Sequence, residues 1–130
     1  IMKENIIGIK TVAFAIRIVK FNKYLITDHK EYILSRQLMK SGTAIGALVR
    51  EAEHAESKPD FVHKMSIALK EANETDYWLL ILKEGEFINE VEYNSIQKDC
   101  SEIIRILASI VKSTKKAISD AKNYKNNDKE

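Results

Sequence analysis

The sequence is poor in residues that cross-link or interrupt a chain. Its 130 residues include one cysteine, one proline and four glycines. A single cysteine excludes an internal disulfide framework and suits a reducing cytoplasm. So few helix breakers favour long helices joined by short links. The length is enough to bury a core without disulfides or metals, so we expect a single domain over residues 1–130.

Long hydrophobic runs and a strong charge of one sign are also missing. The fairly apolar residues 6–26 are interrupted by four basic residues, so this segment is neither a signal peptide nor a membrane span. Lysine and arginine number 21 against 19 aspartates and glutamates, a balance of +2. This balance is too close to neutral to indicate a nucleic-acid-binding protein by itself, although the charge can be unevenly placed.

The clearest pattern lies in residues 60–82. Apolar or small side chains recur there at alternating steps of four and three, which places them on one face of an α-helix. They are Phe61, Met65, Ala68, Ala72, Thr75, Leu79 and Leu82. Asp60 is expected to be the N-cap, and Pro59 stops a preceding helix from running in.

The end of this helix carries more apolar surface than one stripe. Tyr77, Trp78, Leu80 and Ile81 surround the core positions there. Three neighbouring helices of one subunit should not suffice to cover so many sides. We therefore expect these four residues at an oligomer contact.

The same spacing predicts helices over residues 9–25, 31–55 and from 89 to about 118. Their predicted core positions are Val12, Ile16 and Val19, with Ala13 and Phe14 beside them; Leu34, Leu38, Ser41, Ile45, Leu48, Ala52 and Ala55; and Tyr93, Ile96, Cys100, Ile103, Leu107, Ile110, Thr114 and Ala117. From Ser119 onward the pattern ends, and a frayed or disordered polar tail is expected. Four helices with short links predict an all-α, antiparallel up-down-up-down four-helix bundle.

Two glycines stand in the middle of the second predicted helix. Gly42 and Gly46 lie one turn apart on the same flank. Each costs about 1 kcal/mol of helix stability relative to alanine. Close packing of another helix backbone against this flank is the simplest way to offset that cost.

No catalytic constellation emerges from the sequence. Glu51 and His54 form one Glu-x-x-His element of the kind found in di-iron bundles, but no second copy is present and both lie off the apolar stripe. Cys100 falls on the core stripe, where a thiol usually acts as a small hydrophobe. We therefore expect no enzyme, no cofactor and no metal. Lys64 and Glu71 are expected to be partly buried and paired, with Arg36 or Arg50 as possible partners.

Part of the sequence resembles a known family. The segments are RQLMKSGTAIG at 36–46, EA at 51–52, SKPDFVHK at 57–64 and ALKEANETDYWL at 68–79. They resemble the four-helix bundle proteins named after intervening sequences in bacterial 23S ribosomal RNA genes. The resemblance implies a bundle that assembles into a ring, typically a pentamer, without enzymatic activity. One departure is Leu48, where the family commonly has asparagine.

Similar rings serve as accessory proteins of diversity-generating retroelements, where they bind nucleic acid and a reverse transcriptase. Two functions are therefore expected as alternatives. The first is a cytoplasmic, oligomeric scaffold that binds RNA or DNA; the second is an assembly module for a protein partner. The basic residues available for nucleic acid are Lys10, Arg17, Lys20 and Lys23 on the first helix and Lys112, Lys115 and Lys116 on the last.

Overall fold

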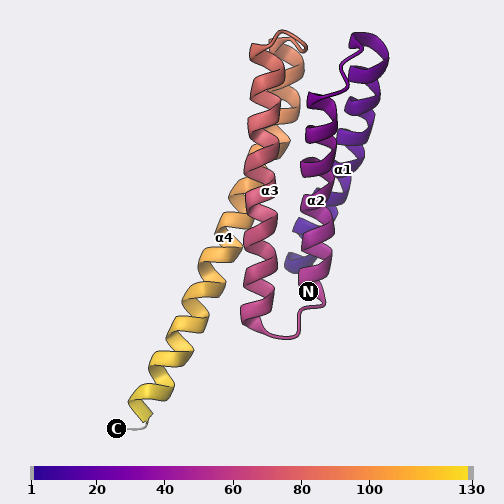
Figure 1. The fold of residues 1–130 in the computed structure, drawn as a ribbon. Coiled ribbons are helices and arrows are strands. Elements are labelled where there is room, and N and C mark those ends of the chain that lie inside the picture. Colours follow the sequence, from indigo (N-terminus) through magenta and orange to yellow (C-terminus); the bar gives the residue numbers. More distant parts are fainter. Residues whose placement is uncertain (1, 129–130) are drawn as a thin grey trace.

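The structure is a computed structural model that describes residues 2–128, with side chains described from residue 6 onward. Four helices follow one another along the chain: α1 (Met2–His29), α2 (Leu34–Glu53), α3 (Lys58–Glu84) and α4 (Glu90–Asp128). Consecutive helices run antiparallel, and α4 returns beside α1 (Figure 1). The predicted all-α, up-down-up-down four-helix bundle is therefore confirmed. Residues 1, 129 and 130 of the expected domain lie outside the described residues.

The core uses the predicted faces of α2, α3 and α4, except that Ala117, predicted for the core face of α4, is exposed. Six of the seven predicted positions on α3 are buried, and Phe61 is half-buried. Leu38 of α2, Leu79 of α3 and Leu107 of α4 are fully enclosed. Each such side chain contributes roughly 1.5–3 kcal/mol relative to an exposed one. On α2 the stripe is shifted at one position, because Val49 rather than Leu48 is buried.

The predicted core face of α1 is wrong. Val12 and Ile16 are exposed, while Phe14 and Ile18 are buried. The helix is apolar on opposite sides, so spacing alone did not determine which side would face the bundle. The side of α1 that carries Ile18 faces the bundle because Ile18 fills the space that Gly42 of α2 leaves open.

The seam between α1 and α4 is polar. The Arg17 guanidinium pairs with Asp99 at 2.6 Å and donates to the Ser95 carbonyl at 3.1 Å. Lys10 pairs with Glu102 at the next level of the seam. These contacts fix how α4 lies along α1, although exposed ion pairs contribute little net stability.

The helix starts follow from short polar residues. Ser57, rather than the predicted Asp60, is the N-cap of α3, and its hydroxyl accepts from the Asp60 amide at 3.1 Å. Asp60 lies in the first turn, where its carboxylate accepts from the Glu56 amide at 3.2 Å. Before α4, Asn89 and Glu92 each accept from the other's backbone N–H, at 2.8 and 2.9 Å. This is the reciprocal arrangement of a capping box.

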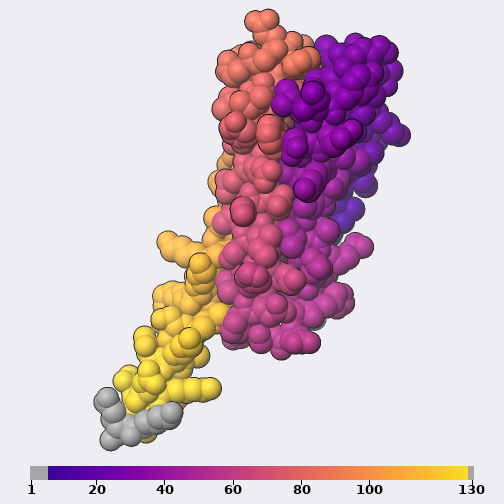
Figure 2. Space-filling model, viewed as in Figure 1, coloured from indigo at the N-terminus to yellow at the C-terminus, as the bar shows by residue number. Residues whose placement is uncertain are grey.

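The prediction of a frayed tail from Ser119 is wrong within the described residues. Helix α4 continues to Asp128 and leaves the bundle as a single projecting helix (Figures 1 and 2). Nothing in this part of the sequence breaks a helix, since residues 90–128 contain no glycine or proline. Lys116 and Asp120 add an i,i+4 pair at 2.8 Å. We call residues 112–128 the α4 extension.

No helix within residues 2–128 combines the length and apolarity that a membrane crossing requires.

Candidate assembly and nucleic-acid surfaces

The outward face of α1 carries a row of exposed apolar side chains. Ile6, Ile9, Val12 and Ile16 keep 45, 68, 41 and 52% of their surface exposed. We call these four residues the α1 face. A helix that is apolar on opposite sides is normally covered on both. The α1 face is therefore the strongest candidate in the described residues for a contact with another chain.

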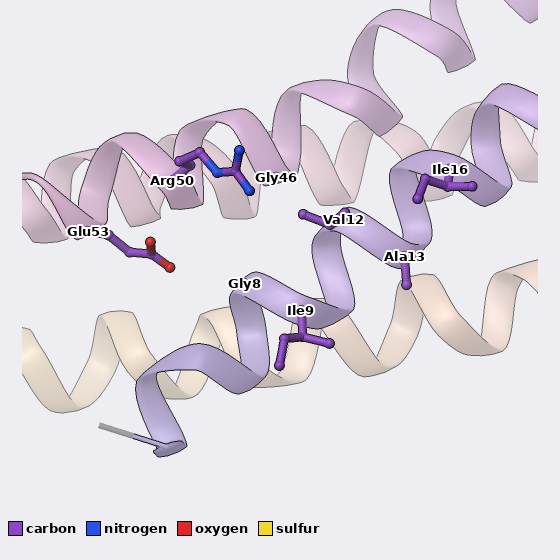
Figure 3. A pocket seen from close by; sticks show the side chains of 8 residues that line it. All are labelled: Gly8, Ile9, Val12, Ala13, Ile16, Gly46, Arg50 and Glu53. Atoms are coloured by element: carbon purple, nitrogen blue, oxygen red, sulfur yellow. The ribbon is translucent and has the colours of Figure 1, made fainter.

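A shallow groove of about 500 Å³ runs between the α1 face and α2 (Figure 3). Small residues keep it open: Gly8 and Ala13 on α1 and Gly46 on α2. Arg50 and Glu53 extend from α2 along its other side. The groove thus combines an apolar wall with one group of each charge, which suits a protein surface better than a small polar ligand.

Sequence reasoning missed the α1 face because it assigned Val12 and Ile16 to the core. The available signal was that Phe14 and Ile18, on the opposite side of the helix, are also apolar. A helix with two apolar sides needs two partners, and only one of them is present in the bundle.

The residues predicted at an oligomer contact on α3 differ in their exposure. Tyr77 and Leu80 are 54 and 41% exposed, while Trp78 and Ile81 are half-buried. The Tyr77 and Trp78 rings meet edge to face with centroids 5.1 Å apart. The Trp78 indole N–H donates to Glu74 at 3.4 Å. Tyr77 and Leu80 form a second exposed apolar patch, which we call the α3 patch.

Gly42 and Gly46 both face α1. A Cβ added to Gly42 would lie 2.9 Å from Ile18 Cγ1, and one added to Gly46 would lie 3.3 Å from the Thr11 carbonyl oxygen. At Gly46 the close neighbour is backbone, so the two helices approach each other directly.

The seven basic residues predicted for nucleic acid are in different situations. Lys10 and Arg17 are engaged in the α1–α4 ion pairs, and Lys116 pairs with Asp120. The remaining four are exposed and make no ion pair with any residue in the described range: Lys20, Lys23, Lys112 and Lys115.

The structure does not bring the basic residues of α1 and α4 together. The Lys10–Glu102 pair marks one level of the bundle. From this level α1 runs toward Lys23 while α4 runs toward Lys112 in the opposite direction. At 1.5 Å per residue the two lysines are separated by roughly 35 Å along the bundle. They therefore form two separate surfaces on one subunit.

The expected pairing of Lys64 and Glu71 is wrong. Both are half-buried, but among the residues with described side chains neither forms an ion pair, and nor do Arg36 or Arg50. The ion pairs that join helices among the described side chains are instead the two on the α1–α4 seam and the pair of Lys83 on α3 with Glu90 on α4, at 3.3 Å.

Cys100, the single thiol of the chain, is buried. Burial raises the pKa of the Cys100 thiol to about 12, and its S–H donates to the Ala72 carbonyl at 3.4 Å. A thiol with this pKa stays protonated near neutral pH and is a poor nucleophile. Glu51 and His54 are both exposed. Within the described residues no three His, Cys, Asp or Glu side chains gather as a metal site would require.

Comparisons with known proteins agree with this architecture. The chain is similar to a crystal structure of a protein of unknown function from the S23 ribosomal protein family of Bacteroides thetaiotaomicron, at 49% identity and a TM-score of 0.83. The similarity covers 85% of this chain and 98% of the other. A search of curated proteins gives no match. The family model of the 23S rRNA-intervening sequence protein matches residues 3–109, a span that ends before the α4 extension. The chain therefore belongs to the family of 23S rRNA-intervening sequence proteins.

Proposed function

We propose that the protein is a non-enzymatic, cytoplasmic scaffold whose subunits assemble into a ring, with a pentamer favoured, and which binds RNA or DNA through basic surface residues. The α1 face carries this proposal. Ile6, Ile9, Val12 and Ile16 present contiguous apolar surface beside a groove with small residues at its base. Covering such surface yields about 25 cal/mol per Å² of apolar area removed from water.

A ring is favoured over a two-fold dimer because the chain has two unlike apolar surfaces. The α1 face lies in the first half of α1, and the α3 patch lies near the end of α3. Contact between unlike surfaces is head-to-tail, and such contacts form rings when the rotation closes.

Nucleic-acid binding is supported by exposed lysines that are not engaged in ion pairs. Lys20 and Lys23 lie on one surface of the subunit, and Lys112 and Lys115 on another. A ring repeats each weak cluster around the assembly, so that several contacts act together.

The alternative is an assembly module for a protein partner without a nucleic-acid role. One observation favours it: Lys10 and Arg17, two of the seven candidate basic residues, are engaged in ion pairs with α4. The groove beside the α1 face would then accept a segment of a different protein.

Two measurements test the proposal. Light scattering on the full chain at micromolar concentration is expected to give a mass near five times the 14.9 kDa of one subunit. Titration with mixed-sequence RNA and DNA is expected to show binding that weakens steeply from low to physiological salt, because phosphate contacts release counterions. A strict monomer would contradict the assembly. An assembled protein that binds no nucleic acid at low salt would favour the protein-partner alternative.

A further inference from the structure

The α4 extension begins beside the start of α3, where Thr114 lines a groove with Lys58 and Phe61, and then projects from the bundle (Figure 2). Of its side chains only Thr114 and Ile118 are half-buried; the others are exposed. It also lies beyond residue 109, where the match to the family model ends. The family match therefore does not cover the extension.

The extension holds the net positive charge of the protein. It contains five lysines and two aspartates, a balance of +3. Because the whole chain carries +2, the remaining residues sum to −1. A slightly acidic body thus bears one basic helix.

The charges of the extension are sorted around its axis. At 100° per residue, all five lysines fall within one half of the helix circumference and both aspartates within the other. Lys115, Ser119, Lys122 and Asn126 follow one another along the middle of the basic half. The flanks of this half carry Lys112 and Lys116 on one side and Lys125 on the other.

The opposite half excludes a membrane surface as the target. It carries Asp120 and Asp128 with only Ala117, Ala121 and Tyr124 as less polar residues. A helix that lies in a lipid interface needs a broad apolar face to bury, and two carboxylates there oppose insertion. The chemistry fits a polyanion that contacts one side of the helix.

We propose that the basic half of the α4 extension docks into the major groove of double-stranded DNA, with its flanking lysines on the phosphates of the two strands. This inference rests on the proposed nucleic-acid role and assigns that role to one segment and one ligand. An α-helix about 10–12 Å across fits the roughly 12 Å major groove of B-form DNA. The major groove of A-form RNA is too narrow and deep to admit it.

Short polar side chains support this orientation. Ser119 and Asn126 lie along the middle of the basic half, where they would approach the groove floor, while Ile118 lies close to the Lys125 flank. The Lys116–Asp120 pair is exposed, so a phosphate can replace the carboxylate with little loss. Contacts of this kind are mainly to the phosphate backbone of the DNA. Binding is therefore expected to depend little on the DNA sequence.

The test uses the full chain with two matched triple variants. The first is Lys115→Glu/Lys122→Glu/Lys125→Glu in the extension. The second is Lys40→Glu/Lys70→Glu/Lys98→Glu, which changes three exposed lysines of the bundle by the same charge. Circular dichroism and light scattering verify that both variants keep the helix content and mass of the wild type.

Binding to a 30-base-pair DNA duplex is measured across salt concentrations. The extension variant is expected to bind at least about tenfold more weakly and to reduce the salt slope by about three, since each neutralised phosphate contributes roughly 0.9 to that slope. The bundle variant is expected to stay within about twofold of wild type. A 30-base-pair RNA duplex is expected to bind wild type at least about tenfold more weakly than the DNA.

The possible failures are distinguishable. Equal loss in both triple variants, or loss on Lys20→Glu/Lys23→Glu alone, would overturn the assignment to the extension and leave the proposed nucleic-acid role intact. Duplex RNA binding as tightly as DNA would overturn the docking geometry. Wild type that binds only vesicles of anionic phospholipid, or that binds no nucleic acid at low salt, would overturn both proposals.

Discussion

Gly42 sets how closely α1 approaches α2. Its missing side chain provides the space in which Ile18 is completely buried, and Gly46 does the same for the α1 backbone at Thr11 one turn further along. A larger residue at Gly42 would meet Cγ1, Cγ2 and Cδ1 of Ile18, all within 3.2 Å of the added Cβ. A β-branched side chain enclosed on every side has little freedom to move away.

Gly42→Leu is therefore expected to lower the free energy of unfolding. Overpacking costs roughly 1–3 kcal/mol, partly offset by about 1 kcal/mol of improved helix propensity. Ala47→Leu is the matched control, since Ala47 is exposed on the same helix. Urea unfolding at one protein concentration measures both variants. Equal stability of the two would contradict the close-packing interpretation.

The hydrogen bond between Ser41 and Thr75 could not be predicted from the spacing of apolar residues. The periodicity placed Ser41 and Thr75 on core faces, and both are buried. It gave no indication that their hydroxyls lie 3.0 Å apart, joining α2 to α3. Such a contact depends on the rotation of two helices about their axes, and each helix's own sequence fixes only its apolar side.

Among the elements, α4 has the best-defined start. Asn89 accepts from the Glu92 amide and Glu92 accepts from the Asn89 amide, so two backbone donors at the helix end are satisfied. The packing of α4 on α3 therefore begins from a fixed first turn.

Asn89→Ala is expected to reduce stability by about 0.5–2 kcal/mol through loss of this cap. The control is Asn94→Ala, which removes the same side chain from an exposed position within the helix and should be neutral or slightly stabilising. Thermal unfolding followed by circular dichroism compares the two. A cap variant as stable as the Asn94 variant would show that water replaces the side chain at no cost.

The elements differ in how far the sequence determined them. Helix α3 has one apolar stripe, and its buried face was predicted almost residue by residue. Helix α1 has two, so the direction of Val12 and Ile16 depended on the glycines of α2. The sequence prediction made α4 too short. The regular spacing of apolar residues ends at Ser119, and the helix was expected to end there as well. Lysine, alanine and aspartate at proper spacing continue a helix without a core.

At the scale of the whole molecule, we predict that the α1 face determines assembly. Ile9→Lys/Ile16→Lys is expected to convert the oligomer to monomers by light scattering, because a charge would have to be buried at each contact. The control Ile33→Lys/Val91→Lys makes the same exchange at two residues outside the α1 face and the α3 patch that are 76 and 78% exposed. Wild type should melt at a temperature that rises with protein concentration, as bound partners stabilise the fold. If the Ile9/Ile16 variant keeps the mass of the wild-type oligomer, the α1 face is not the contact between subunits.

The projecting end of α4 also makes each subunit an electric dipole. Its tip lies about 15 Å beyond Ile118, the last half-buried residue of α4, at 1.5 Å for each of ten residues. Physiological salt screens charges over a Debye length of about 8 Å, so the slightly negative body does not cancel the positive tip. A polyanion arriving by diffusion would meet the field of the tip first, and the subunit would be turned toward it before any contact formed. The length of α4 thereby governs how the subunit is oriented when it meets a polyanion, as well as the area over which the two make contact.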